Sequence, residues 1–181
     1  MEKILIFVGS AREGNSLYLA NQIKESAQPE QCEVIRLSDY NISYCDGCLS
    51  CDEAGICHIK DGMNKLLELI DSSNKMILIT PARWSLMSGD MKVFIDRLNP
   101  FAASSKMSGK LAYGFAIGQS DDEDSKSIEL ALDSLRYFCE NAEIEFVGGN
   151  IITSCLMADD LEQKQETLNA CVEGAISFIN S

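Results

Sequence analysis

Half of the eight cysteines in this chain fall in one short stretch, at positions Cys45, Cys48, Cys51 and Cys57. Short turns bring neighbouring sulfurs close together, so four soft thiolate donors at this spacing can converge on one metal centre. His58, the only histidine, follows Cys57 directly and opens a second interpretation, a zinc site with three cysteines and one histidine. Free thiols are the third interpretation.

The remaining cysteines have no such spacing. They lie in or beside predicted helices and strands and are interpreted as small buried apolar side chains: Cys32, Cys139, Cys155 and Cys171. The chain begins Met1-Glu2-Lys3 and runs directly into a strand-like segment without a signal peptide, so a reducing, cytoplasmic location is predicted. Cysteines in that compartment act as metal ligands or stay reduced.

A glycine-containing loop, residues 9–16, follows the first strand-like run and precedes a helical pattern. Phosphate capture needs small residues, free backbone N–H groups and a helix N-terminus that faces the anion. Gly9 and Gly14 permit the backbone to curl, and Arg12 can add a charge-assisted bond. The candidate phosphate-binding residues are Ser10, Ala11, Arg12, Gly14, Asn15 and Ser16. In the alternative interpretation the glycines make a turn, and Asn15 and Ser16 only cap the helix.

A second loop, Thr80–Met87, carries the only tryptophan, Trp84. A planar aromatic ligand held by its phosphate at residues 9–16 would meet this loop next. Trp84 can pack beside such a ring, and nearby backbone amides can bond its polar edge. The candidate residues for this part of the site are Pro81, Ala82, Arg83, Trp84, Ser85 and Gly118. Alternatively, Trp84 covers the core or a subunit interface, and Arg83 points to solvent.

Strand-like and helical segments alternate along the chain and position these loops. Apolar runs typical of buried parallel strands are residues 3–8, 75–80 and 110–117, with weaker strands at 33–37 and at 144–147, resuming at 150–152. Helical periodicity occurs at 16–27, 63–70, 88–98 (capped by Ser88), 123–140 and 161–179. This order predicts an α/β, flavodoxin-like three-layer sandwich with a five-stranded parallel sheet in the order 2-1-3-4-5. Ligands of such sheets bind beyond the carboxyl ends of strands one and three, where both loops lie.

The length of the chain predicts a single domain over residues 1–181. One connection, from Ser38 to about Lys60, lacks periodicity and forms a cysteine-rich loop at about 40–60. Structureless loops longer than about 12–15 residues are usually functional or disordered, and bound metal would order this one.

Several function classes are excluded. The net charge of −13 argues against nucleic acid and against an anionic membrane surface, and no apolar stretch is long enough to span a bilayer. There is no Gly-x-x-x-x-Gly-Lys-Ser/Thr segment, so a P-loop NTPase is excluded. There is no Gly-x-Gly-x-x-Gly either, so a dinucleotide pyrophosphate site is not indicated.

These loops resemble the NADPH-dependent FMN reductase and iron–sulfur flavoprotein families, which have a flavodoxin-like fold. The resemblance runs from Met1 to about Gly118 and is strongest at residues 9–16, 44–51 and 81–97. The sequence departs from the family at Ala11, where proline is frequent. It departs again at Ala82-Arg83-Trp84, where a Val-Tyr-Trp-like stretch is usual, and Arg83 places a cation at an otherwise apolar position.

The resemblance implies an oxidoreductase in which the 9–16 loop holds the phosphate of FMN and the segment Pro81–Ser85 lines its ring. It also implies that the four clustered cysteines bind a [4Fe–4S] cluster. NAD(P)H would be the electron donor, and the acceptor would be a quinone, a flavin, another small molecule or a redox protein. A homodimer or homotetramer is expected. Two alternatives remain open: an electron carrier for a ferredoxin-like partner, and a zinc-stiffened flavin-binding module.

Overall fold

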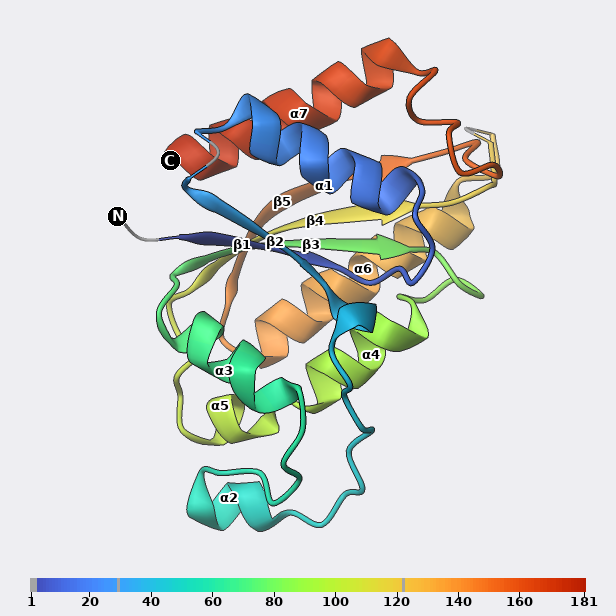
Figure 1. The fold of residues 1–181 in the computed structure, drawn as a ribbon. Helices are drawn as coiled ribbons and strands as arrows, with labels where there is room; N and C mark the ends of the chain where they lie inside the picture. Colours follow the sequence, from blue (N-terminus) through green and yellow to red (C-terminus); the bar gives the residue numbers. More distant parts are fainter. Residues whose placement is uncertain (1–2, 29, 122) are drawn as a thin grey trace.

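The computed structural model describes residues 3–28, 30–121 and 123–181, in which five parallel strands form one sheet. The strands are β1 (Ile4–Val8), β2 (Cys32–Arg36), β3 (Lys75–Pro81), β4 (Leu111–Ile117) and β5 (Glu145–Ile152). Their order is β2-β1-β3-β4-β5, so the predicted flavodoxin-like topology is confirmed (Figure 1).

Helices cover both faces of the sheet and complete the three layers (Figure 1). On one face lie α1 (Asn15–Ser26) and α7 (Gln165–Asn180), and on the other lie α3 (Met63–Asp71), α4 (Gly89–Asp96), α5 (Asn99–Ala103) and α6 (Lys126–Asn141). Alternate residues of a strand point to opposite faces. Ile4 and Ile6 of β1 therefore join one core and Leu5 and Phe7 the other. No helix among the described residues is both long enough and apolar enough to cross a bilayer.

The connection between β2 and α3 contains two short helices that the sequence pattern did not indicate. A 3-10 helix, Leu37–Asp39, continues directly from β2, and α2 (Ser50–Ala54) lies within the cysteine-rich loop. Leu49 and Gly55, which flank α2, have φ angles of 60° and 64°, so left-handed residues limit this helix to a single short segment. Figure 1 shows α2 at the far side of α5 from the sheet.

Several predicted element boundaries were wrong, among them those of β3, β5, α6 and α7. β3 includes Pro81, because Ala82 makes the next ladder bond, to the carbonyl of Ile117 at 2.7 Å. β5 is one strand, in which a bulge at residue 147 joins the two predicted pieces. α6 begins at residue 126 and not at 123, and α7 begins at 165 and not at 161. Leu161 precedes α7 but is fully buried, which explains why it fits the apolar pattern from which the helix was predicted.

Candidate functional site

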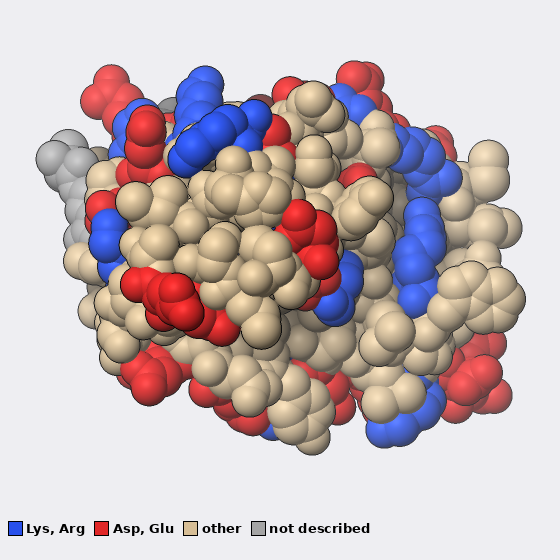
Figure 2. Space-filling model, turned by 90° about the horizontal axis from the view of Figure 1, so that it is seen from below, with Lys and Arg blue, Asp and Glu red and all other residues tan. Residues whose placement is uncertain are grey.

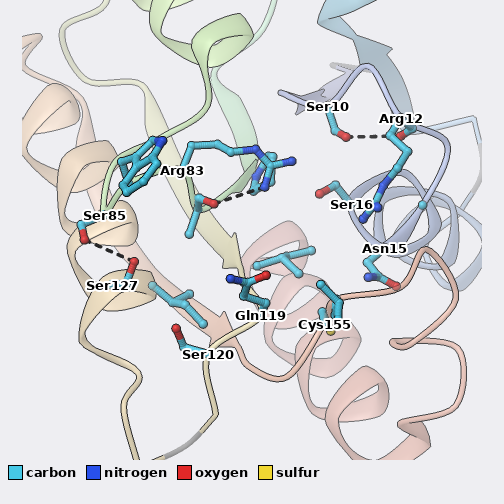
Figure 3. A pocket seen from close by; sticks show the side chains of 18 residues that line it. Ser10, Arg12, Asn15, Ser16, Arg83, Ser85, Gln119, Ser120, Ser127 and Cys155 are labelled. Carbon is cyan, nitrogen blue, oxygen red and sulfur yellow. Dashed lines mark hydrogen bonds between the residues drawn. The ribbon is translucent and has the colours of Figure 1, made fainter.

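A pocket opens at the carboxyl-terminal edge of the sheet, beyond the ends of β1, β3 and β4 (Figure 3). It encloses about 520 Å³, within the usual ~300–1,000 Å³ of small-molecule sites. Its lining comprises Ser10, Arg12, Gly14, Asn15, Ser16, Pro81, Ala82, Arg83, Trp84, Ser85, Ile117, Gly118, Gln119, Ser120, Ser127, Ile128, Cys155 and Leu156. The two predicted loops therefore form walls of one cavity.

Every predicted ligand-binding residue except Ala11 lines this pocket. The carbonyl of Ala11 instead accepts a hydrogen bond from Arg36 Nη2, and Arg36 Nη1 lies 3.3 Å from the carboxylate of Glu13. Arg36 is the last residue of β2. It therefore ties the outer part of the loop to the sheet, and Ala11 contributes through its backbone.

The sequence pattern did not indicate the remaining lining residues: Ile117, Gln119, Ser120, Ser127, Ile128, Cys155 and Leu156. The sheet order was a usable signal for some of them, because residues after β5 reach the edge at which β4 ends. Gly118 N donates to Ile152 O at 2.9 Å, and Cys155 N donates to Gly118 O at 2.8 Å. Cys155 is buried, as predicted, and burial raises the pKa of its thiol, yet it also lines the pocket.

The first wall is the loop before α1. The N-cap residue is Gly14, which makes no side-chain cap, so neither Asn15 nor Ser16 plays the capping role of the alternative interpretation. The first N–H groups of any α-helix have no partner within the helix, and Asn15 and Ser16, the first two residues of α1, line the pocket. Figure 3 shows Ser10, Arg12 and Ser16 grouped on this wall. This arrangement suits a phosphate group.

The side chain of Asn15 has a different task from the one predicted. Its Nδ2 donates to Met157 O at 2.7 Å, and its Oδ1 accepts from Leu161 N at 3.0 Å. Both polar atoms therefore fasten the segment after β5 to the start of α1. Asn15 shapes the wall of the pocket, while its backbone N–H remains at the helix N-terminus.

The opposite wall is a tight turn. Arg83 and Leu86 exchange backbone hydrogen bonds of 2.8 and 3.0 Å, and the two residues between them, Trp84 and Ser85, have φ angles of 50° and 64°. Ser85 Oγ lies 3.2 Å from Ser127 Oγ of α6. Trp84 is 97% exposed, so it does not cover the core of this chain. Its indole stands free at the mouth of the pocket.

The charge of the pocket is opposite to that of the chain. Among the lining residues, two arginines, Arg12 and Arg83, carry charge, and no aspartate or glutamate is present, although the whole chain has a net charge of −13. Figure 3 shows Arg83 reaching from the turn toward the wall that holds Arg12. An anionic ligand would thus meet local positive charge.

Two glycines shape the base of this site. A Cβ at Gly9 would lie 2.7 Å from Ser88 Oγ, so only glycine allows this approach. A Cβ at Gly118 would lie 2.5 Å from Ile128 Cγ1. The sequence predicted that Gly118 lets the backbone approach a ligand closely. Its tight packing against Ile128 of α6 is a second reason for a glycine at this position.

Ser88 connects three elements beneath the pocket. Its Oγ donates to Gly9 O at 2.6 Å and accepts from Met91 N at 3.2 Å, which confirms the predicted cap of α4. Its backbone N–H donates to Thr80 Oγ1 at 2.8 Å. Ser88 therefore holds these three elements together: its hydroxyl joins the phosphate-type loop to the start of α4, and its backbone N–H binds the end of β3.

Ser88→Ala is expected to lower the free energy of unfolding by about 1–3 kcal/mol, because a buried carbonyl and a helix N-terminus lose their partner. Urea denaturation measures this loss. The matched control is Ser72→Ala, which removes an exposed hydroxyl bonded to Leu69 O at 2.8 Å. Equal losses in the two variants would show that Ser88 does not hold the site together.

The four clustered cysteines lie in the projecting loop, and none forms a disulfide. Cys51 is buried, Cys45 and Cys57 are half-buried, and Cys48 is exposed. Within the described residues, the one group of metal-type donors whose atoms all lie within 4.8 Å of one another is Asp46, Cys48 and His58. Neither the four cysteines nor three of them with His58 form such a group in the part of the chain that the structure describes.

The donor chemistry of the loop, four cysteine thiols, fits the ligand set of an iron–sulfur cluster. Each thiolate of a four-iron cluster binds a different iron, so its four sulfurs sit farther apart than those around one zinc ion. Burial raises the pKa of the Cys51 thiol, and Asp52, Cys57 and Cys45 raise it further by their negative charge. The thiolate of Cys51 is therefore disfavoured by negative charge on Cys45 and Cys57. A cationic metal group would relieve that repulsion.

A buried ion pair closes the base of this loop. Arg97, 2% exposed, follows α4, and Asp61 lies where the loop returns to α3. Arg97 Nη1 lies 2.7 Å from Asp61 Oδ2, and Nη2 lies 3.1 Å from Oδ1, a forked arrangement. Burial lowers the pKa of Arg97, but the bonds and charge of Asp61, with a contribution from Cys57, raise it above its usual value.

The pKa of Asp61 is lowered to about 2. Burial would raise this pKa, but hydrogen bonds from Arg97, Ser43 N and Met63 N, together with the charge of Arg97, outweigh burial. Because the pKa of an aspartate in an unfolded chain is about 3.9, the stabilisation is complete above about pH 4 and is lost as pH falls through about 2.

The free energy of unfolding of the wild type, measured with denaturant between about pH 2 and 6, should therefore fall as Asp61 becomes protonated. Asp61→Asn should be less stable at neutral pH and should lose less of its remaining stability on acidification. Parallel stability curves for the two proteins would contradict the assignment of this titration to Asp61.

The sheet order and the pocket beyond β1 and β3 define a flavodoxin-like protein with a site for a mononucleotide-type ligand. Residues 2–141 match the family described as NADPH-dependent FMN reductase. The chain belongs to this family.

Related proteins agree with this placement. The chain is 34% identical over 87 residues to an iron-sulfur flavoprotein of Archaeoglobus fulgidus, covering 48% of this chain and 39% of that one. It is 29% identical over 121 residues to an iron-sulfur flavoprotein of Methanocaldococcus jannaschii, covering 65% and 63%. The chain thus spans less than two thirds of the length of these relatives. A solved flavone reductase has the same fold, with a TM-score of 0.76 at 13% identity over 98% of this chain and 62% of that one.

Proposed function

We propose that this protein is an FMN-dependent oxidoreductase that accepts electrons from NAD(P)H and passes them to a small-molecule acceptor such as a quinone or a flavin. The observation that carries the proposal is the pocket itself. A helix N-terminus with Arg12 faces a turn with an exposed indole across one cavity. Membership of the FMN reductase family supports FMN as the mononucleotide.

The residues of the pocket bind and orient the cofactor. Arg12, Ser10 and Ser16 hold the phosphate together with the N–H groups that begin α1. The turn at residues 83–86 borders the ring and leaves Trp84 at its outer side. When bound, FMN supplies the redox chemistry, so no acid–base side chain is required.

The cysteine-rich loop supplies a second redox group in this proposal. Cys45, Cys48, Cys51 and Cys57 would hold a [4Fe–4S] cluster, in agreement with the names of the two relatives. The cluster would exchange electrons with FMN. Because α2 projects away from the sheet of its own chain, we propose a homodimer or homotetramer in which this loop approaches the pocket of a neighbouring subunit (Figure 1).

The surface around the loop supports contact with another protein. Tyr44, Leu49 and Ile56 are large apolar residues of the loop, and each is more than 60% exposed. Figure 2, which looks onto the face carrying the loop, shows a broad area of uncharged side chains with both acidic and basic groups around it. Such a surface suits a second copy of the chain or a redox partner.

An anaerobic visible spectrum before and after addition of NADPH tests this function. Flavin and cluster absorption should both be present, both should bleach with NADPH, and denaturation should release FMN. Protein that releases FAD or no flavin under these conditions would refute the proposal. Iron and acid-labile sulfide in near-equal amounts would identify the cluster, and zinc would exclude it.

A second candidate function is an electron carrier for a ferredoxin-like protein. The exposed cysteine loop and the net charge of −13 favour docking to a basic partner. The same spectrum separates the two functions. A carrier would hold FMN and cluster, would bleach with a reduced ferredoxin, and would respond poorly to NADPH.

A further inference from the structure

The guanidinium of Arg97 has five N–H groups, and the structure gives partners to four of them. Nη1 donates to Ser43 O and to Asp61 Oδ2, both at 2.7 Å. Nη2 donates to Asp61 Oδ1 at 3.1 Å and to Ile59 O at 3.4 Å. The fifth group, on Nε, is buried and has no hydrogen-bond partner among the described residues.

An unpaired N–H on a buried cation is costly, about 1–3 kcal/mol or more, and calls for an explanation. The side chain is 2% exposed, so water is not a ready partner. Cys57 lies two positions before Ile59, whose carbonyl accepts from Nη2 at 3.4 Å, and Cys57 contributes to raising the pKa of Arg97. The sulfur of Cys57, when it carries negative charge, is therefore the nearby acceptor to which the free Nε–H can donate a hydrogen bond.

The partners of Arg97 also define the limits of the cysteine-rich loop. Ser43 precedes Cys45, and Ile59 follows Cys57 by two residues, so one side chain binds the backbone on both sides of the four cysteines. Asp61 reinforces this arrangement, since its Oδ2 also accepts from Ser43 N at 2.8 Å. The loop therefore starts and ends on the same buried ion pair.

We propose that Arg97 is a positioning residue for the metal-binding loop: it closes the base of the loop and directs its Nε–H at the sulfur of Cys57. This inference rests on the proposed cluster. A [4Fe–4S] centre with four thiolates carries net negative charge, and this chain is itself strongly acidic. A fixed cation and an N–H···S bond both stabilise added negative charge, so both favour the reduced cluster.

The test compares wild type, Arg97→Lys and the control Arg136→Lys, all purified anaerobically as full chains. Arg136 lies on α6, away from the loop, and pairs with Asp133 and Glu140. Lysine keeps the charge beside Asp61 but loses the fork and the Nε–H. Iron and sulfide per chain, the thermal midpoint and the cluster potential are measured.

In Arg97→Lys, the ratio of reduced to oxidised cluster at a fixed potential should fall about tenfold, equivalent to about 59 mV for one electron. Iron and sulfide should also be lost several-fold faster to a chelator. The control should match wild type in both. An Arg97→Lys protein with wild-type potential and iron retention would overturn the proposal and leave Arg97 as a partner of Asp61 alone.

A measurement on the wild type covers the case in which the variant does not fold. With ¹⁵N-labelled arginine, the Nε–H resonance of Arg97 should be shifted by the paramagnetic cluster and should return toward its ordinary position in iron-free protein. An unshifted resonance in cluster-loaded protein would overturn the proposal. If wild-type protein contained no iron and sulfide, both the cluster and this inference would be refuted. The FMN assignment is tested separately, by the flavin that the protein releases on denaturation.

Discussion

Arg12→Ala is expected to weaken FMN binding about 10- to 100-fold. A charge-assisted hydrogen bond to a phosphate contributes about 1.5–3 kcal/mol, and about 1.4 kcal/mol corresponds to tenfold in Kd. Arg12 is exposed, and its contact with Ser10 Oγ is made by its backbone carbonyl, at 3.2 Å. Alanine preserves that contact, so the loop should keep its shape. Fluorescence titration of flavin-free protein with FMN measures the change.

The matched control is Lys24→Ala, which removes a cation from the last turn of α1, the end of the helix away from the phosphate-type loop. This variant should bind FMN as wild type does. If Arg12→Ala also bound FMN with wild-type affinity, the loop would be a structural turn and not a phosphate site. Adding Ser10→Ala to Arg12→Ala should weaken FMN retention further while leaving the thermal midpoint close to that of wild type.

Asp61→Ala is expected to lower the free energy of unfolding by about 3–5 kcal/mol, because it leaves Arg97 as an uncompensated buried charge. The loss also includes the hydrogen bonds to Ser43 N at 2.8 Å and to Met63 N at 3.0 Å. Denaturant unfolding measures the effect. The exposed pair Lys92–Asp96, 2.6 Å apart, provides the comparison, and Asp96→Ala should cost no more than about 1 kcal/mol.

A double variant shows whether the charge is the cause. Asp61→Leu with Arg97→Met removes both charges, so it should lose less stability than the sum of the two single variants. Losses that simply add would show that packing volume, and not the buried ion pair, stabilises this region.

The sheet could be predicted because three of its five strands, β1, β3 and β4, are largely apolar runs. Residues 4–8 and 111–117 contain no charged side chain and are mostly apolar, which is the pattern of parallel strands covered on both faces. Glycine-rich turns and helical periodicity between them then fix the order of elements. The bulge in β5 was not predictable, because Gly148 and Gly149 interrupt the apolar pattern while the backbone pairing continues.

The candidate site was predictable where a loop follows a predicted strand, and less so elsewhere. Residues 10–16 follow β1, and residues 81–85 begin at the last residue of β3, so the topology places both at one edge of the sheet. The role of the Asn15 side chain was not predictable, since its partners Met157 and Leu161 lie far away in the sequence. Arg97 was assigned to a helix pattern, and only its buried partners show that it belongs to the cysteine-rich loop.

The most direct test of the central claim is one titration of flavin-free protein with FMN and with riboflavin, followed by the emission of Trp84, the only tryptophan. If the N-terminus of α1 and Arg12 bind the phosphate, FMN should bind at least about 100-fold more tightly than riboflavin. FMN should also quench the indole at the mouth of the pocket. Equal affinities for the two flavins, or emission that FMN leaves unchanged, would contradict the proposed site.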